Sequence, residues 1–372
     1  MYESLCKLSY IIIKIMEVHT NMKKRFTILL VFALLINCFT LTSFASEEKP
    51  DSKIPTKIDY SFSKQDNWKN MSLNQKLELC QIPMDVAEKM TTEALLDSIL
   101  ENPFTALILA FDSNEAGYQR VKDLIPAFQI LLNRSDLGSV MTKKYAICSE
   151  RTSNQDIMSS MYLSVMLAQP EIEKIVSNVE KKSFETSLKV TDNQIYRISK
   201  EEHKIKDDTT DGVQALAASG YYSTTTTTTN KGTIIEVKKW TGVDFDTTEQ
   251  AAAHQSFTSL FSYSSYVHPA TLKYNCHSYA FYAQSTSNPY WMEGPYVDKY
   301  MTDGSYYQVS TPTASDRVHW HNGDHSGIIV GVGSAAGNVT VISKYGNYGV
   351  YRAFIGDVSS AYGDSNYTFW RR

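Results

Sequence analysis

The hydrophobic pattern changes once along the chain of 372 residues, and this change limits the fold more than any single motif does. Over residues 60–176 the apolar residues recur at the spacing of one helix face, as in Leu73, Leu77 and Cys80. Over residues 233–372, short runs of β-branched and aromatic residues alternate with Gly and Asn turns. The sequence therefore predicts an α+β chain whose N-terminal part is helical and whose C-terminal part contains an antiparallel sheet.

The C-terminal part is expected to hold two helices as well as the strands. One helix is predicted at residues 249–265 and a short one at residues 276–285. The predicted strands cover residues 233–240, 316–322, 325–334, 338–346 and 349–355.

Residues 177–232 separate these two parts and differ from both. They contain charged runs and six threonines at 224–229, with few apolar residues at any period, so they bury little surface. We therefore expect a helical domain at 60–176, a linker at 177–232 and a second domain at 233–372. The threonine run is alternatively an edge strand, because β-branched residues favour extended backbone.

Polar residues in the helical part are placed as helix caps and not as a reactive site. Ser72 and Gln75 have the spacing of a capping box, and Asp112 with Ser113 precedes another helical segment. Cys80 lies on the apolar face of its helix and is expected in the core. No pair of titratable residues in this part has a spacing that indicates chemistry.

The segment before the helical part resembles a secretory signal. Residues 22–45 begin with three basic residues, continue with an apolar run that is short for the about 20 residues of a membrane span, and end in a small-x-small site at Ala45. We expect residues 1–45 to be removed, with Ser46 as the new N-terminus. The predicted protein is secreted and has no stable membrane anchor.

Cysteine content and charge narrow the function classes further. Only Cys80, Cys148 and Cys276 follow residue 45, too few to hold a secreted fold together with disulfides, so a large core is expected. The net charge of −4 gives no basic field for a phosphate backbone. The partner is therefore expected to be neither DNA nor RNA.

Cys276 stands in the stretch KYNCHSYAFY, residues 273–282, where a short helix is predicted to begin. A helix N-terminus and a nearby histidine both favour the thiolate, which is the nucleophilic form of cysteine. The unpaired backbone N–H of Cys276 is placed to stabilise an oxyanion. His325 begins a predicted strand, where its ring can face the helix end and act as the base.

These segments resemble parts of a known family. YNCHSYAFY is similar to the cysteine-bearing helix start of the papain-like amidohydrolases of the NlpC and CHAP types, in which Asp or Asn precedes the cysteine. SDRVHWHNGDHSGIIVGV is similar to the paired strands of that family. The resemblance covers roughly residues 235–355 and implies that Cys276 is the nucleophile and His325 the base. It also implies an orienting polar residue on the next strand, VTVISKYGNYG, where Ser343 is the expected match and Lys344 and Asn347 are the alternatives.

The same resemblance implies an amide bond in peptidoglycan or a peptide as the substrate, and no cofactor is expected. Tyr274, His277 and Trp291 are expected to contact the substrate. His277 is rotated by about 100° from its neighbour Cys276 on a helix, so its ring is expected to face away from the sulfur.

Four other interpretations remain open. The chain is alternatively a secreted binding protein that has lost turnover, or a secreted protease or acyltransferase that acts on proteins. Cys276 is alternatively a zinc ligand together with His319, His321 and His325, since zinc accepts nitrogen and sulfur ligands. A lone cysteine followed by aromatic residues is also typical of a hydrophobic core.

Overall fold

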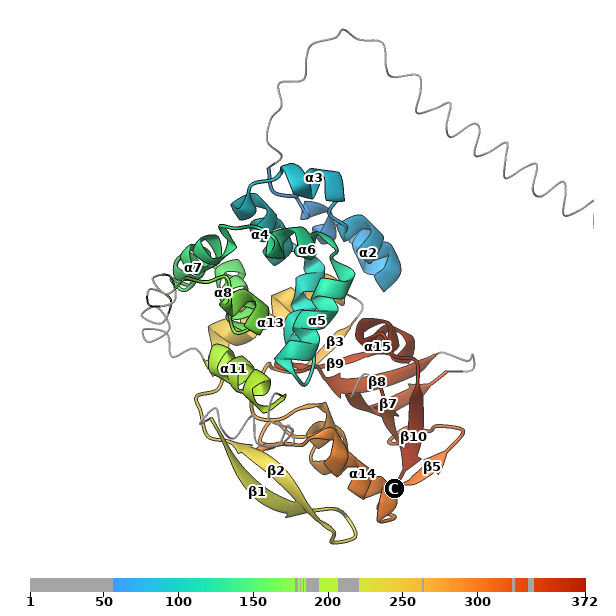
Figure 1. The fold of residues 1–372 in the computed structure, drawn as a ribbon. Coiled ribbons are helices and arrows are strands. Elements are labelled where there is room, and N and C mark those ends of the chain that lie inside the picture. The colour runs from blue at the N-terminus through green and yellow to red at the C-terminus, as the bar shows by residue number, and fades with distance from the viewer. Residues whose placement is uncertain are drawn as a thin grey trace, which may run out of the picture. The chain divides into compact units, whose positions relative to one another are not determined.

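The computed structural model describes residues 56–177, 180, 182, 184, 194–206, 221–262, 264–322, 325–333 and 338–372 (Figure 1). The expected signal segment at residues 1–45 lies outside them.

Short helices build the N-terminal part, and local capping explains where several of them begin. Ser72 forms the expected capping box with Gln75 at the start of α2, and Ser113 and Ser153 each accept a backbone N–H in the first turn of α5 and α8. The helices of this part are η1 (Ser61–Lys64), η2 (Asp66–Asn70), α2 (Leu73–Cys80), α3 (Met84–Lys89), α4 (Thr92–Glu101), η3 (Pro103–Leu109), α5 (Asn114–Leu124), α6 (Ala127–Leu132), α7 (Leu137–Cys148), α8 (Asn154–Leu167), α9 (Pro170–Glu173) and α11 (Gln194–Lys206).

The C-terminal part contains two antiparallel sheets. The larger has the strand order β3-β9-β8-β7-β6-β10-β5 and the smaller β1-β2-β4. The strands are β1 (Tyr222–Thr228), β2 (Ile234–Trp240), β3 (Ser265–His268), β4 (Tyr290–Trp291), β5 (Tyr307–Val309), β6 (Arg317–Trp320), β7 (His325–Val332), β8 (Val339–Lys344), β9 (Val350–Phe354) and β10 (Tyr367–Arg371). The expected α+β class and the five expected strands, here β2, β6, β7, β8 and β9, are confirmed.

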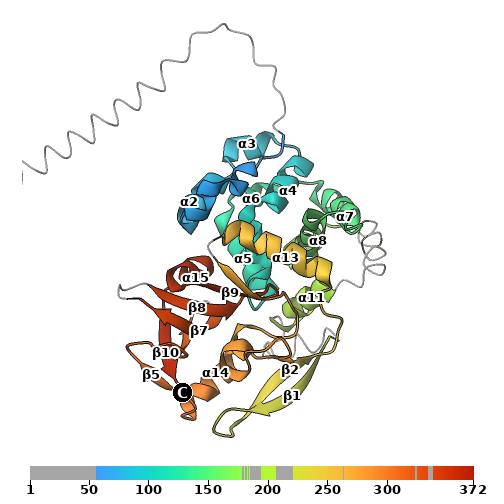
Figure 2. The same cartoon turned by 180° about the vertical axis from the view of Figure 1, so that it is seen from behind.

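Among the described residues of the C-terminal part, four helices are present. They are α13 (Thr247–Leu260), the π-helix η4 (Ser278–Tyr282), α14 (Gly294–Thr302) and α15 (Ile355–Tyr362). Asp246 starts α13 with a capping box to Glu249. Figures 1 and 2 show α13 among the N-terminal helices, beside α8, although it follows them by many residues in the sequence.

The helical part and the sheet share one core, so the expectation of two independent domains was wrong. Ile54–Arg372 form one compact unit, and a single cluster of buried side chains extends from Tyr60 to Tyr362. Trp68 of η2 donates its indole N–H to Ser259 O of α13 at 2.6 Å. Because this cluster contains large apolar residues from both parts, neither part can expose its face without a large hydrophobic cost.

The expected linker is also partly ordered structure within this unit. Ile195 and Ile198 of α11 are buried in the shared core. The threonine run forms β1, an edge strand paired with β2, as the alternative had predicted. Residues 178–179, 181, 183, 185–193 and 207–220 lie outside the described residues.

Different helices pack against the two faces of the larger sheet. α15 packs against β8 and β9 on one face, where Trp320, Tyr345 and Tyr362 belong to the shared core. η4 packs against β7 and β8 on the other face, where Ile328 and Ile342 contact Tyr274 and Tyr279. Since side chains alternate along a strand, neighbouring residues of β7 enter these two environments in turn.

Candidate functional site

Cys276 is the first residue of a helical segment, as the sequence predicts. The side chain of Asn275 accepts the backbone N–H of Ser278 at 3.1 Å, which is the bond of an N-cap residue. The chain then has α-helical geometry at residues 276–277 and continues as η4. The pair Asn275-Cys276 therefore combines a cap with a cysteine held at the helix start.

Asp112 from the helical part meets Cys276. The Cys276 thiol donates to Asp112 Oδ2 at 3.2 Å, and the Asn275 side-chain amide donates to the same oxygen at 2.8 Å. Asp112 and Ser113 were expected together as a capping pair. Ser113 does cap α5, but the Asp112 carboxylate is directed to the cysteine.

The segment that carries Asp112 is fixed against the end of β8. Gly346 has a φ of 44°, and a Cβ on it would meet Phe111 O at 2.3 Å, so only glycine permits this approach. Asn347 donates its backbone N–H to Leu109 O at 2.8 Å and its side-chain amide to Asn114 Oδ1 at 3.1 Å. These contacts position Asp112 from both sides along the chain.

His277 faces the same carboxylate as Cys276. Its Nε2 lies 3.5 Å from Asp112 Oδ2, and a ring nitrogen of His277 lies within 4.8 Å of the Cys276 sulfur. The expectation that this ring faces away was wrong. Two side chains about 100° apart on a helix converge here because Asp112 lies between them.

A chain of polar groups continues from His277 into the sheet. His277 Nδ1 lies 2.8 Å from Ser326 Oγ on β7, and His319 Nδ1 on β6 lies 3.0 Å from the same oxygen. His277, His319 and Ser326 are all buried. One hydroxyl therefore fixes the orientation of both imidazole rings.

His325 and Ser343 form a second pair. Ser343 Oγ lies 2.7 Å from His325 Nε2, so these two predicted site residues are brought together. The His325 ring stacks on Tyr362 with centroids 4.0 Å apart and also packs against Trp320 and Tyr345.

This second pair faces away from the Cys276 helix. In the β6–β7 register, His325 is opposite Trp320 and Ser326 is opposite His319. Consecutive residues of a strand point to opposite faces, and Ser326 is the one that reaches His277. The structure therefore directs His325 into the aromatic core beneath α15, not toward the face with the cysteine.

Lys344 is a buried cation on the Cys276 face of the sheet. Its Nζ donates to the backbone oxygens of Thr271 and Gly346 and lies 5.5 Å from the centre of the Tyr274 ring. Burial lowers the pKa of Lys344 to about 7, although the negative charge of Asp112 acts in the opposite direction. Of the two alternative third residues, Lys344 thus lies near the cysteine, whereas Asn347 holds the Asp112 segment.

The two aromatic residues expected to bind substrate are core residues in this structure. Tyr274 is fully buried and stacks on Tyr279. Trp291 on β4 is buried and contacts Tyr222 edge to face. The stretch that contains Trp291 covers the core and contributes strand β4, so neither aromatic side chain is placed to contact a substrate in this structure.

Asp112, Cys276 and His277 offer an oxygen, a sulfur and a nitrogen atom, all within 4.8 Å of one another. The alternative zinc site considered from the sequence combined Cys276 with other residues, His319, His321 and His325. His319 and His321 do share a strand face, with ring centroids 4.9 Å apart, but His321 is exposed and bonds to Thr368. A metal would find its ligands at Asp112 and His277, not at His321.

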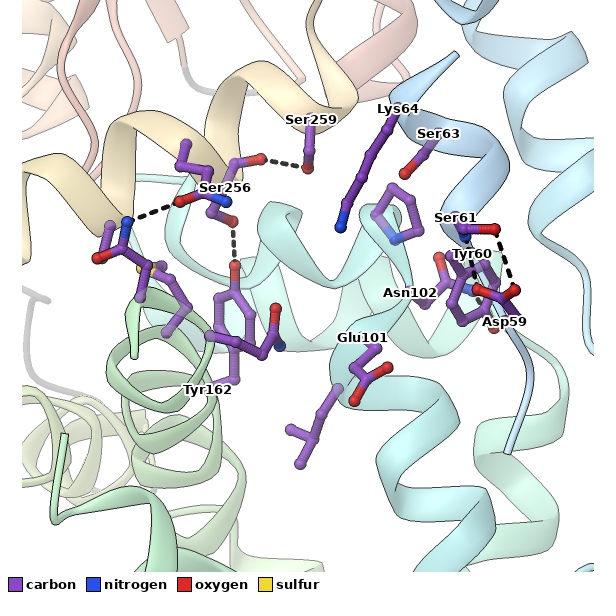
Figure 3. Close-up of a pocket in the computed structure, with 17 residues that line it drawn as sticks. Asp59, Tyr60, Ser61, Ser63, Lys64, Glu101, Asn102, Tyr162, Ser256 and Ser259 are labelled. Carbon is purple, nitrogen blue, oxygen red and sulfur yellow. Dashed lines mark hydrogen bonds between the residues drawn. The ribbon is translucent and has the colours of Figure 1, made fainter. Parts of the chain in front are cut away.

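A polar cavity of about 360 Å³ lies elsewhere, between η1, α4, α8 and α13 (Figure 3). Its lining includes Lys64, Glu101, Asn102, Tyr162 and Ser256, and the Tyr162 and Ser256 hydroxyls bond to each other. Residues of the Cys276 cluster do not line it. The cavity is lined by hydroxyl, amide and charged groups.

Searches against protein-family models, curated proteins and solved structures found no match. Within the described part of the chain, no helix has both the length and the apolar character needed to cross a membrane.

Proposed function

We propose that this chain is a secreted cysteine-dependent hydrolase that cleaves an amide bond in peptidoglycan or a peptide. The observation that carries the proposal is the convergence of Cys276 and His277 on one carboxylate oxygen of Asp112. Cysteine, imidazole and carboxylate are the three groups of a nucleophilic triad, which is recognised by geometry and not by chain order.

In the proposed reaction, the Cys276 proton passes to Asp112 Oδ2, to which the thiol donates, and from there to His277 Nε2, and the sulfur attacks the carbonyl carbon of the substrate. The imidazolium that forms is stabilised by Asp112 on one side and by Ser326 Oγ on the other. His277 then gives its proton to the leaving amine, and water releases the acyl group from the sulfur. His277 takes the role of base that the sequence assigned to His325, because His325 lies on the other face of the sheet.

The reaction requires that the substrate can reach the Cys276 sulfur. Cys276 and His277 have no exposed surface, and Asp112 lies against them. A substrate therefore reaches the sulfur only after the segment around Asp112 moves, as active-site loops do in many enzymes. The bonds that would have to open are those of Asn347 to Leu109 and Asn114.

The test measures amide cleavage by the secreted protein on peptidoglycan sacculi and on an unfolded protein substrate, scored by newly released amino groups. We expect Cys276→Ala to abolish release, and the matched control Cys148→Ser, which changes a buried cysteine of α7, to retain it. Release from the protein substrate alone would favour a protein-directed protease over a peptidoglycan hydrolase. Equal release by wild type and Cys276→Ala would overturn the proposal.

The full burial of Cys276 favours one second candidate, a secreted binding protein on which turnover has been lost. Such a protein would sediment with peptidoglycan sacculi without releasing amino groups. Its thiol would be alkylated by iodoacetamide no faster than those of Cys80 and Cys148, which are buried as well. A Cys276 that reacts faster than both near pH 7 would exclude this candidate.

A further inference from the structure

Two of the three distances between the donor atoms of the Cys276 cluster are close to those of a metal site. Asp112 Oδ2 lies 3.2 Å from the Cys276 sulfur and 3.5 Å from His277 Nε2. A tetrahedral zinc ion with bonds of about 2.0–2.3 Å holds its ligand atoms about 3.3–3.7 Å apart. Both separations are within a few tenths of an ångström of this spacing, and the Cys276 sulfur and a His277 ring nitrogen lie within 4.8 Å of each other.

We propose that Asp112, Cys276 and His277 bind a divalent zinc-class ion and that the bound ion keeps Cys276 from acting as a nucleophile. The ion-binding part stands on the donor geometry alone. The inhibitory part rests on the proposed function. Three protein ligands leave a fourth tetrahedral position for water.

The groups around the three ligands are arranged to orient them. Asn275 donates to the ligating oxygen of Asp112 at 2.8 Å, which fixes the carboxylate. Ser326 Oγ contacts His277 Nδ1, and His319 contacts the same hydroxyl from its other side. If His277 carries its proton on Nδ1 and donates it to Ser326, the Ser326 hydroxyl can donate to His319, and His277 Nε2 presents a lone pair to the ion. Such outer partners determine the tautomer and the affinity of metal-binding histidines.

Binding exchanges a proton for the ion. The Cys276 S–H bond breaks, its proton leaves to solvent, and a metal–sulfur bond forms, because the thiolate is the metal ligand. The proton bound between Cys276 and Asp112 is thereby lost, and both groups become ligands. The sulfur lone pair that would attack a carbonyl carbon is then engaged with the ion.

The test uses the full secreted protein stripped of metal with a chelator. Zn²⁺ binding is followed by calorimetry, and Co²⁺ serves as a spectroscopic probe because a thiolate-to-cobalt charge-transfer band reports sulfur ligation directly. We expect one ion per chain with that band. Asp112→Asn should weaken Zn²⁺ binding by about 10-fold or more, and Cys276→Ser should remove the band.

Two further variants show whether zinc binds at this site or through other side chains. His321→Gln changes an exposed histidine of the alternative zinc set considered from the sequence and should leave binding unchanged. Ser326→Ala removes only an orienting partner and should weaken binding by about 10–100-fold. Circular dichroism of each variant shows whether it folds. If Cys276→Ser does not fold, the conservative Asp112→Asn variant still tests the site.

The outcomes distinguish this inference from the proposed function. If the apoprotein hydrolyses amides through Cys276 but binds no zinc, or if zinc raises its rate, the inference is overturned and the hydrolase stands. If zinc binds with the expected dependence on Asp112 and Cys276 while no hydrolysis occurs with or without metal, the ion site stands and the hydrolase fails. Binding that is unchanged in Asp112→Asn and Cys276→Ser places the ion elsewhere and overturns the inference.

Discussion

Two neighbouring residues of β7 lead into opposite environments. His325 enters a face of aromatic rings, where Tyr362 stacks on it and Ser343 is its hydroxyl partner. Ser326 enters a polar face, where its hydroxyl joins two imidazole rings. The same residue types, histidine and serine, thus form a packed pair on one face and a reactive network on the other.

This difference shows what converts polar residues into a candidate site. The His325 pair is surrounded by large side chains that contribute packing and no further charge. The other face receives a carboxylate from Asp112 and a thiol from Cys276. Because electrostatic interactions are stronger in a buried environment than in water, the face with the convergent charged groups is the one where proton transfer can be tuned.

The largest expected effect is a loss of amide hydrolysis, and it should distinguish the histidine of one face from the histidine of the other. His277→Gln should lower amide hydrolysis by about 10²–10⁴-fold, the contribution typical of a general base, because glutamine accepts no proton. His325→Gln should change the rate by less than about 10-fold. The measurement is kcat/KM for both variants on one amide substrate, with folding checked by circular dichroism. The reverse order would assign catalysis to the face beneath α15.

For the free energy of unfolding, the loss of His325 should have a larger effect than the loss of His277. His325→Ala should cost roughly 2–4 kcal/mol, because it removes a buried ring that stacks on Tyr362 and leaves a cavity in the shared core. Urea unfolding monitored by near-UV circular dichroism measures the loss. A cost below about 1 kcal/mol would mean that the aromatic face does not depend on this ring.

The sequence predicted the local parts of this arrangement well. The cap at Ser72, the strands β6 to β9 and the helical start at Cys276 all depend on residues within a few positions of one another. The pairing of Ser343 with His325 was implied by the family resemblance, and the two residues lie on neighbouring strands, β8 and β7. These features need no knowledge of distant contacts.

The site itself depends on distant contacts, which is why it was missed. Asp112 joins Cys276 across 164 positions, and before a helix an Asp-Ser pair has the pattern of an ordinary cap. The face of His325 depends on strand register, since a shift by one residue exchanges the two faces. The shared core was missed because charged residues dilute the apolar pattern around Ile195 and Ile198.

A buried lysine gives the polar face a contribution to stability that depends on pH. Burial lowers the pKa of Lys344 from 10.5 to about 7. Between these values the unfolded chain holds more protons than the folded chain, so the contribution of Lys344 to stability rises with pH, and the cost of burying its charge is fully present below pH 7. The gain from about pH 7 to about pH 9 is on the order of 2 kcal/mol.

Lys344→Met should remove this gain, so the difference in unfolding free energy between wild type and variant should change by that amount over the same range. The acidic groups that oppose the shift are Asp112, Asp244 and Cys276, and all three remain in the variant. Urea unfolding of both proteins at several pH values supplies the measurement. Parallel curves would mean that Lys344 remains charged in the folded chain.

The smallest expected effects are those of replacing the two serines, one on each face of the sheet. Ser343→Ala and Ser326→Ala should each cost about 1 kcal/mol, because each removes a buried hydroxyl that bonds to a histidine. Their effects on hydrolysis should differ. Ser326 orients His277, so its loss should lower kcat by about 10-fold with KM unchanged, since substrate contacts are not altered. Ser343→Ala should leave kcat at the wild-type value. If the two changes had equal effects on kcat, residues on both faces of the sheet would influence the reaction at Cys276. The assignment of catalysis to the face of Ser326 alone would then be wrong.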